Sequence, residues 1–479
     1  MKPNRIILII FISAAVLRVA TLWMAPLWYD ENFTLILSRL PFARMIAATA
    51  GDTHPPLWYI ITWAWVHAFP SLPVWTLRIP SMLCSIAALF VFDRILVETK
   101  INQRVRIVAL VLMAILPVNL YYAMEARMYA LLELEVLLCF WAILKLDRRA
   151  LVLAAAGTAL MYTQNYGGFY LAALALAWLS LHPSRKFSNL FNALVTFALP
   201  VLLWLPWLNV MLGQMNAISG HYWILGFSLG YILQTLPKSM LMSQSIATRE
   251  ILPVMVFYSW LVIGLIAAIR HRTGYLRLTA VLTLAFLPFG LAVAASYAWQ
   301  PVLLFRPLIG SVPFLVLLLA APADDLKNIR HWLLATIFIL PIFVARDLSL
   351  YMYMSESKGS GATASILGYL KAHWQPGDVI YISGDGAWVN YTPYTDMPIV
   401  KLPECAPTLG ALTDATRQAI GETVQAYPGG RAWLLWTRDP LTPACELASI
   451  APLVADPSRP DHVIWWDELQ KYGIWLLDK

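Results

Sequence analysis

Long apolar segments joined by short polar connections dominate the first 350 residues of the chain. A bilayer core about 30 Å thick needs roughly 20 apolar residues per helix, and fewer where a span is buried in a bundle. Eleven segments meet or approach that length, and together they predict a mainly α fold, a polytopic membrane helix bundle over residues 1–354. They run approximately over 6–23, 77–96, 107–122, 128–146, 151–165, 166–181, 190–210, 251–269, 278–299, 302–321 and 332–350.

The connection between the first two spans is long enough to hold structure of its own. It contains an amphipathic stretch over 32–48 and a 13-residue apolar stretch over 57–69, which is too short to cross a bilayer comfortably. Both stretches predict helices that lie along the membrane surface.

The chain after Ser355 has a different pattern. Strand-like and helix-like runs alternate there, which predicts a small C-terminal α/β domain over residues 355–479. The strand-like runs are 378–383, 432–437 and 472–477, and the helix-like runs are 362–373 and 412–425.

Composition excludes a soluble protein, because 60% of the residues are hydrophobic and only 13% are charged, against about 25% charged in soluble domains. The apolar part before Ser355 holds 25 basic and 13 acidic residues, and the tail holds 9 and 14. The positive charge therefore belongs to the membrane part, and nothing indicates a nucleic-acid partner.

Charge placement predicts the orientation, because short cytoplasmic loops collect Lys and Arg. A cytoplasmic N-terminus places 16 of the 25 basic residues of the membrane part in six short inner segments, which are 2–5, 94–106, 145–149, 185–186, 270–277 and 327–330. An odd number of spans then leaves the C-terminal domain outside, periplasmic or extracellular, for a multi-pass protein of a bacterial cytoplasmic membrane. No small-residue cleavage pattern follows residues 6–23, so we expect a retained span rather than a signal peptide.

The four cysteines agree with this sidedness. Cys84 and Cys139 fall in apolar spans, where they act as small buried hydrophobes. Cys405 and Cys445 are the pair in the outer domain, and an oxidising compartment would favour joining them. They are a disulfide candidate only, since the sequence gives no distance between them.

Ionisable residues at the membrane are expensive, so they are functional candidates. With the predicted topology they gather in four clusters at the outer ends of spans: Asp30-Glu31, Asp52 with His54, Glu125 with Arg127, and Arg306. No comparable cluster occurs on the inner face, so we expect any chemistry to face away from the cytoplasm.

These side chains suit a transfer reaction on an anionic donor. Asp30 can act as a general base toward a hydroxyl, and Glu31 beside it can position the acceptor or raise the pKa of Asp30. Arg127 and Arg306 can donate to phosphate oxygens. His54, before two prolines, can supply a further donor or a proton.

Plainer interpretations exist for each cluster. Asp30-Glu31 can be the start of a helix at Asn32, because carboxylates favour helix N-termini. Arg127 and Arg306 can each be interfacial residues whose side chains reach toward water. The functional interpretation depends on the four clusters sharing one side.

Together the quoted motifs resemble the GT-C class of polytopic glycosyltransferases, in the bacterial branch related to protein O-mannosyltransferases and lipid A aminoarabinose transferases. The resemblance covers roughly residues 1–350. It is carried by Trp28-Tyr29-Asp30-Glu31, Asp52-Thr53-His54-Pro55-Pro56-Leu57-Trp58-Tyr59, Tyr121-Tyr122-Ala123-Met124-Glu125-Ala126-Arg127-Met128-Tyr129-Ala130 and Arg306-Pro307-Leu308.

This resemblance implies a sugar donor on polyprenyl phosphate and transfer with inversion to a glycan, lipid or protein acceptor. Asp30 matches the catalytic Asp and Glu31 its acidic neighbour. The candidates for binding the donor phosphate or sugar are Asp52, His54, Glu125, Arg127, Tyr129 and Arg306.

Other possibilities stay open at the level of sequence. A divalent metal ion could bind through Asp30, Glu31 or Asp52, although no resident cofactor is required. A transporter or flippase of lipid-linked saccharides is the main alternative, and a non-catalytic glycan-binding relative is another. The sequence does not identify the sugar or the acceptor.

Overall fold

The structure, a computed structural model, describes thirteen segments of the chain. These are residues 3–23, 27–182, 187–218, 228–241, 251–270, 278–299, 301–324, 360–383, 397–402, 414–426, 431–437, 463–465 and 472–478. The chain divides into two compact units, one of residues 1–24 with 37–351 and one of residues 25–36 with 352–479.

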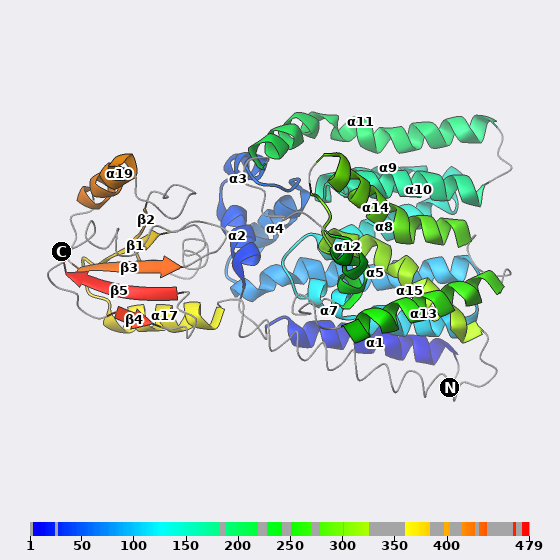
Figure 1. The fold of residues 1–479 in the computed structure, drawn as a ribbon, viewed down its shortest axis with the longest axis horizontal. Coiled ribbons are helices and arrows are strands. Elements are labelled where there is room, and N and C mark those ends of the chain that lie inside the picture. Colours follow the sequence, from blue (N-terminus) through cyan, green and yellow to red (C-terminus); the bar gives the residue numbers. More distant parts are fainter. Residues whose placement is uncertain are drawn as a thin grey trace. The chain divides into compact units, whose positions relative to one another are not determined.

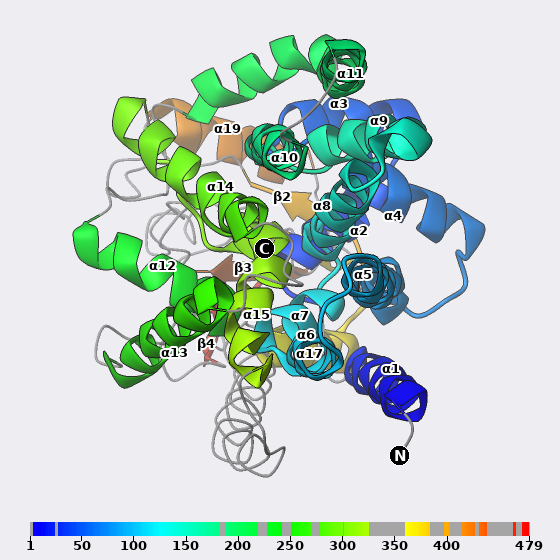
Figure 2. The same cartoon turned by 90° about the vertical axis from the view of Figure 1, so that its right-hand side faces the viewer.

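The first unit is a bundle of helices whose long members run side by side (Figure 1); several of them, such as α5 and α10, are seen nearly end-on in Figure 2. Its elements are α1 (Pro3–Thr21), the C-terminal end of α2 (Tyr29–Arg39), α3 (Phe42–Ala50), α4 (Leu57–Ala68), η1 (Val74–Arg78), α5 (Ile79–Glu98), α6 (Gln103–Ile115), α7 (Pro117–Ala123), α8 (Tyr129–Ile143), α9 (Leu146–Thr163), α10 (Gly167–Leu181), α11 (Phe187–Ile218), α12 (Leu229–Leu241), α13 (Ile251–Arg270), α14 (Leu278–Ala298), η2 (Arg306–Ser311), α15 (Val312–Ala320) and η3 (Ala321–Asp324).

The predicted spans coincide with these helices, apart from 332–350, which lies outside the described residues. Among the described residues, four helices are long and apolar enough to cross a membrane by themselves, and the bent pair α6–α7 would be a fifth. Helices α8 and α10, at 15 residues each, are shorter than these, and α8 is almost wholly buried in the bundle. The protein is therefore a multi-pass membrane protein.

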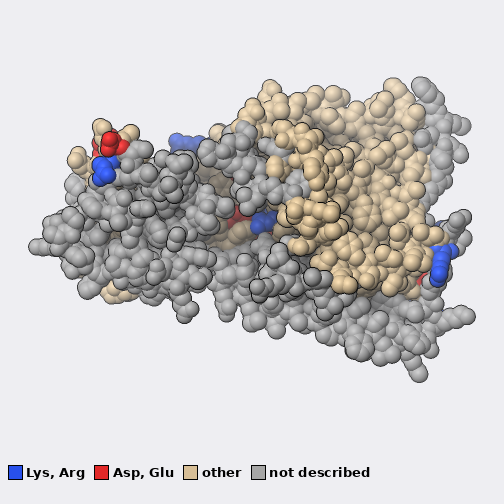
Figure 3. All heavy atoms as spheres, viewed as in Figure 1, with Lys and Arg blue, Asp and Glu red and all other residues tan. Residues whose placement is uncertain are grey.

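Uncharged atoms cover the lengths of the helices on the described face of this bundle (Figure 3). Large apolar side chains such as Leu194 and Leu202 are more than half exposed on α11. Such a surface suits contact with lipid chains and not with water.

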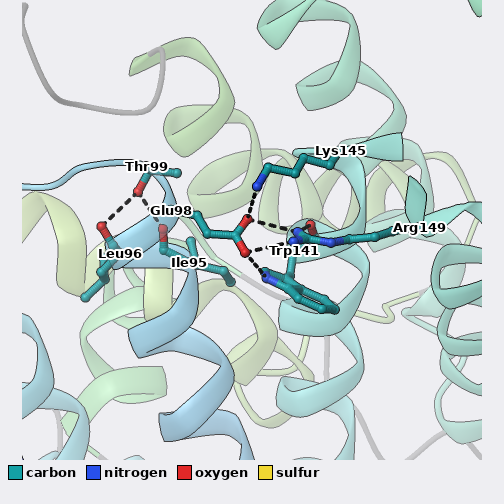
Figure 4. Close-up of polar contacts among 7 residues, drawn as sticks. All are labelled: Ile95, Leu96, Glu98, Thr99, Trp141, Lys145 and Arg149. Carbon is teal, nitrogen blue, oxygen red and sulfur yellow. Dashed lines mark hydrogen bonds and ion pairs between the residues drawn. The ribbon is translucent and has the colours of Figure 1, made fainter. Parts of the chain in front are cut away.

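Charged side chains join α5, α8 and α9 at one end of the bundle (Figure 4). Glu98 accepts two hydrogen bonds from Arg149, at 2.7 and 3.0 Å, and one from the Trp141 indole at 3.1 Å, while the Lys145 ammonium lies 3.6 Å away. The Arg149 guanidinium also stacks 3.7 Å from the centre of the Trp141 ring. Two of the predicted cytoplasmic segments, around 94–106 and 145–149, therefore lie at the same end, as predicted.

The helices of the first outer loop differ in detail from the prediction. The amphipathic stretch over 32–48 forms two helices, α2 and α3, because Pro41 interrupts it and begins α3. The apolar stretch over 57–69 forms α4, as expected. In Figure 1, α3 and α4 lie at the end of the bundle opposite the N-terminus.

The second unit contains a five-stranded sheet in the order β2-β1-β3-β5-β4. Its described elements are the larger part of α2, up to residue 36, with α17 (Ser360–His373), β1 (Val379–Ser383), β2 (Ile399–Lys401), α19 (Asp414–Gln425), β3 (Arg431–Thr437), β4 (Val463–Trp465) and β5 (Tyr472–Asp478). β1 pairs in parallel with β2 and β3, while β5 pairs antiparallel with β3 and β4. The predicted α/β character is confirmed, with two short strands, β2 and β4, added.

Helix α17 covers one face of this sheet. Alternate residues of β1, Ile380 and Ile382, meet Trp433 and Leu435 of β3 in a buried cluster that also contains Leu370 of α17. The period of two explains this placement, since every second side chain of a strand points to the same face.

A buried carboxylate ties the start of β1 to β3. Asp378 is 3% exposed and accepts hydrogen bonds from Arg431 Nε and Nη2 at 3.1 and 2.8 Å and from Trp433 Nε1 at 2.9 Å. The backbone N–H of Gln375 also donates to it, across the turn in which Gly377 has a positive φ of 94°. Burial alone would raise the pKa of Asp378, but these hydrogen bonds hold the pKa below its ordinary value.

We predict that Asp378→Asn destabilises the second unit by about 1–3 kcal/mol, because Arg431 loses its charged acceptor. In the wild type the stabilisation from Asp378 is complete above the ordinary carboxylate pKa of about 3.9 and is lost as the pH falls through its lower folded value. Hydrogen exchange of β1 and β3 in the full-length protein, corrected for intrinsic rates, measures both effects.

The matched control is Glu422→Gln on the exposed face of α19, which should change the same exchange free energies by no more than about 0.5 kcal/mol. Equal effects of the two substitutions would contradict the prediction.

Candidate functional site

The first predicted cluster lies in the first turn of α2. The helix begins at Tyr29, so the expected start at Asn32 is wrong by one turn. Glu31, which is fully buried, accepts a hydrogen bond from the backbone N–H of Trp28 at 3.2 Å and thereby caps the helix. Asp30 next to it is half-buried, and its carbonyl oxygen accepts from the Thr34 hydroxyl at 2.8 Å. The fold thus gives Glu31 a capping role and leaves Asp30 more exposed.

The second and third clusters are joined by a tyrosine. Tyr59, on α4 and fully buried, donates its hydroxyl proton to Asp52 Oδ2 at 2.8 Å and accepts from Arg127 Nη1 at 3.3 Å. Burial, and then the nearby Asp52 carboxylate, raise the pKa of the Tyr59 phenol well above its ordinary value. The phenol therefore stays protonated and can bridge an anion and a cation.

Further contacts fix the segment that carries Arg127. The indole N–H of Trp58 donates to the carbonyl of Ala126 at 3.1 Å, and the Ser81 hydroxyl donates to the carbonyl of Arg127 at 3.3 Å. The N–H of Arg127 itself turns back to the carbonyl of Glu125 at 2.7 Å. Arg127 is only 4% exposed, so its guanidinium is held in a largely water-excluded place.

The acidic and aromatic neighbours of Arg127 are also buried. Glu125 accepts from the Tyr121 hydroxyl at 3.4 Å. Tyr129, the first residue of α8, stacks at a tilt against Tyr122, with ring centres 4.5 Å apart. Tyr121 also packs edge-on against Tyr122, with ring centres 5.1 Å apart, so three buried aromatic rings lie in and next to the Glu125–Arg127 segment.

Arg306 begins η2, just after an irregular segment that several helices hold in place. The Tyr166 hydroxyl donates to Val302 and accepts from the N–H of Leu304, at 2.7 and 3.1 Å. Tyr231 on α12 donates to the carbonyl of Leu303 at 3.0 Å. Arg306 itself is half-buried, and η2 packs against α8.

The turn between α9 and α10 connects this segment with the second cluster. Asn165 donates to the carbonyl of Thr53 at 3.1 Å, while its neighbour Tyr166 binds Val302. His54 follows Thr53 and is half-buried, just before α4. The structure therefore brings the surroundings of Asp52, His54, Arg127 and Arg306 to one end of the bundle.

The structure also limits the other chemical candidates. Within the described segments no group of three or more His, Cys, Asp and Glu side chains could hold a metal ion. Cys84 and Cys139 are free thiols, half-buried and buried. The disulfide candidates Cys405 and Cys445 lie outside the described residues.

Tyr59 is the site residue that the sequence did not assign. It belongs to the motif that begins at Asp52, and its spacing of seven residues from Asp52 was visible. Its bridging role depends on Arg127, which lies 68 residues further along the chain. No local pattern predicts such a contact.

Comparison of sequences finds neither a known protein family nor a curated protein that matches the chain. Comparison of structures does find similar folds. ArnT from Cupriavidus metallidurans, solved in the apo state and bound to undecaprenyl phosphate, superposes with a TM-score of 0.61 at 14% identity, over 98% of this chain and 97% of that one.

Two structures of the Archaeoglobus fulgidus oligosaccharyltransferase are also similar. The form tethered to an acceptor peptide gives a TM-score of 0.54 at 12% identity, over 98% of this chain and 74% of that one. The AglB complex with an inhibitory peptide and a dolichol-phosphate gives 0.51 at 11% identity, over 91% and 69%.

The chain therefore has the GT-C fold, in a multi-pass membrane protein with a small C-terminal sheet unit. Among the similar structures reported, ArnT matches it over nearly the whole length of both chains. The predicted resemblance to the GT-C class is confirmed at the level of fold.

We predict that Tyr59→Phe lowers the thermal unfolding midpoint of the purified protein, because hydrogen bonds to charged groups contribute about 1.5–3 kcal/mol each. The matched control is Tyr162→Phe, which removes one hydrogen bond to the carbonyl of Leu203 at 3.0 Å near the surface. The midpoint of the control should fall distinctly less. Equal midpoints for Tyr59→Phe and the wild type would show that the bridge does not stabilise the fold.

Proposed function

We propose that the protein is a membrane glycosyltransferase that moves a sugar from a polyprenyl-phosphate donor to an acceptor hydroxyl of the cell envelope. The observation that carries the proposal is the match of 98% of the chain to an ArnT structure bound to undecaprenyl phosphate. An AglB structure of the same fold contains dolichol-phosphate. We place the reaction at the outer face of a bacterial cytoplasmic membrane, with the N-terminus inside.

The buried Arg127 is suited to the phosphate of such a donor. A guanidinium offers a planar fork of donors that matches phosphate oxygens, and its hydrogen bonds to an anion are strong where water is excluded. The Tyr59 hydroxyl accepts from the Nη1 atom of Arg127 while donating to Asp52, which holds the guanidinium in place. Arg306 and His54, at the same end of the bundle, are proposed as further donors.

Asp30 is proposed as the general base. The acceptor hydroxyl gives its proton to the Asp30 carboxylate while its oxygen forms a bond to the anomeric carbon. The bond from that carbon to the phosphate oxygen breaks, and polyprenyl phosphate leaves with the electron pair, stabilised by the arginines. One direct displacement inverts the anomeric carbon.

The remaining candidate residues are proposed to bind the donor sugar or to position Asp30 and Arg127. Glu31 caps the turn that presents Asp30. Glu125 and Tyr129 are proposed to bind the sugar, and Asp52 is proposed to act on Arg127 through the hydrogen bonds of Tyr59.

We predict that Asp30→Asn in the detergent-solubilised protein abolishes release of polyprenyl phosphate from a polyprenyl-phosphate sugar, because an amide cannot accept the proton. The thermal midpoint should stay close to that of the wild type, since Glu31 still caps α2. The matched control is Asp147→Asn, another aspartate in the first turn of a helix, which is exposed on α9 and should keep the wild-type rate.

The same variant separates the alternative functions. If Asp30→Asn still moves lipid-linked saccharide across vesicles and the wild type transfers no sugar, the transporter interpretation replaces this proposal. Full transfer activity in Asp30→Asn would exclude Asp30 as the base.

We predict that Arg127→Gln weakens binding of polyprenyl phosphate at least tenfold, since about 1.4 kcal/mol corresponds to a factor of ten and a hydrogen bond to a charged group contributes more. Calorimetric titration of the solubilised protein measures this. Arg106→Gln is the control, because Arg106 pairs with Asp93 at 2.7 Å on neighbouring helices of the bundle. Unchanged affinity in Arg127→Gln would show that Arg127 does not bind the donor phosphate.

A further inference from the structure

The span that leads to the Glu125–Arg127 segment is broken. Helix α6 ends at Ile115, α7 begins at Pro117, and the two axes differ by 50°. Leu116 between them has an extended conformation, with φ of −58° and ψ of 132°. Pro117 has no N–H, so the carbonyl of Met113, four residues earlier, loses its helical donor.

Arg18 supplies donors to this break from another helix. It lies on α1, is 1% exposed, and donates through Nη2 to the carbonyl of Met113 at 3.3 Å and through Nη1 to the carbonyl of Ala114 at 3.1 Å. Its Nε donates to the Ser85 hydroxyl on α5 at 2.9 Å. One guanidinium thus connects α1, α5 and the end of α6.

A second side chain completes the arrangement. Asn119 on α7 donates to the same Met113 carbonyl at 2.9 Å, which fixes the direction in which α7 leaves the break. Glu133 on α8 is also fully buried and interacts electrostatically with Arg18. A buried guanidinium with planar donors suits this task better than a lysine, which has one nitrogen.

The position of α7 determines where the site residues lie. It carries Tyr121 and Tyr122 and continues directly into Glu125 and Arg127. We propose that Arg18 is a positioning residue: by satisfying the carbonyls of Met113 and Ala114 it holds the α6–α7 break in the geometry that places Arg127 at the donor phosphate. This inference rests on the proposed glycosyl transfer, although its structural part can be measured without it.

The test uses the full-length protein in detergent and three variants. Arg18→Lys keeps the charge but cannot reach both carbonyls and Ser85. The double variant Arg18→Met with Glu133→Gln removes both ionisable groups, so that no uncompensated charge can be left in the bundle. Arg106→Gln is the control, because it removes an arginine of α6 that pairs with Asp93 on α5 and lies away from the break.

The readouts are hydrogen exchange of residues 117–128, the thermal midpoint, and kcat and KM for release of polyprenyl phosphate. We expect faster exchange in this segment and a kcat at least tenfold lower in Arg18→Lys and in the double variant, since misplacement by about 1 Å can cost 100-fold. The Arg106→Gln control should lose thermal stability while exchange in 117–128 and kcat stay as in the wild type.

The outcomes distinguish the two proposals. Wild-type exchange and kcat in a folded double variant would overturn the positioning role, as would equal losses in Arg106→Gln. If the wild type itself releases no polyprenyl phosphate, the proposed function fails, and the exchange of residues 117–128 alone then decides whether Arg18 holds the break.

Discussion

In a bilayer there is no water to satisfy backbone N–H and C=O groups, so every irregular segment at membrane depth needs partners from the protein itself. Two irregular segments of this protein show how side chains meet that requirement. Where α6 breaks, Arg18 and Asn119 take the free carbonyls. Where the chain is irregular before Arg306, the Ser296 hydroxyl accepts from two N–H groups at 2.9 Å, and Tyr166 and Tyr231 supply further partners. Both irregular segments lead directly into candidate site residues.

The arginines at the two ends of the bundle are used differently. At the end that carries Glu98, Arg149 and Arg106 make two-pronged pairs with carboxylates, and Arg149 also stacks on Trp141. In such pairs each charged group satisfies the hydrogen-bonding groups of the other, and the pairs hold neighbouring helices together. At the other end, Arg127 donates to the hydroxyl of Tyr59, which in turn donates to the carboxylate of Asp52. A phenol therefore takes part in the contact that joins Arg127 to α4.

The sequence predicted the parts of the fold that depend on local pattern. Apolar length was enough to find α5, α11 and α14, and the period of two was enough to find β1 and β3. The strands β2 and β4 were missed because each has three residues, too few for an alternation to show. Arg18 and Tyr59 were missed for another reason: their roles are contacts to partners 68 to 96 residues away, and one-dimensional patterns do not contain such contacts.

The fold is similar over 98% of the chain to that of ArnT, although the two sequences are only 14% identical. That a fold can be shared by such different sequences has a physical basis. A lipid-facing or packed apolar position accepts many side chains of about the right volume, so most of a helix bundle constrains its sequence weakly. A buried polar contact accepts few substitutes, because an unpaired donor or acceptor is costly. We therefore expect substitution to be least tolerated at the buried polar contacts: the Glu31 cap of α2, the hydrogen bond from Trp58 to Ala126, and the bridge of Tyr59 between Asp52 and Arg127. These residues belong to the short motifs that indicated the fold. The motifs therefore contain the residues that hold the candidate base and phosphate-binding groups in place, as well as those groups themselves.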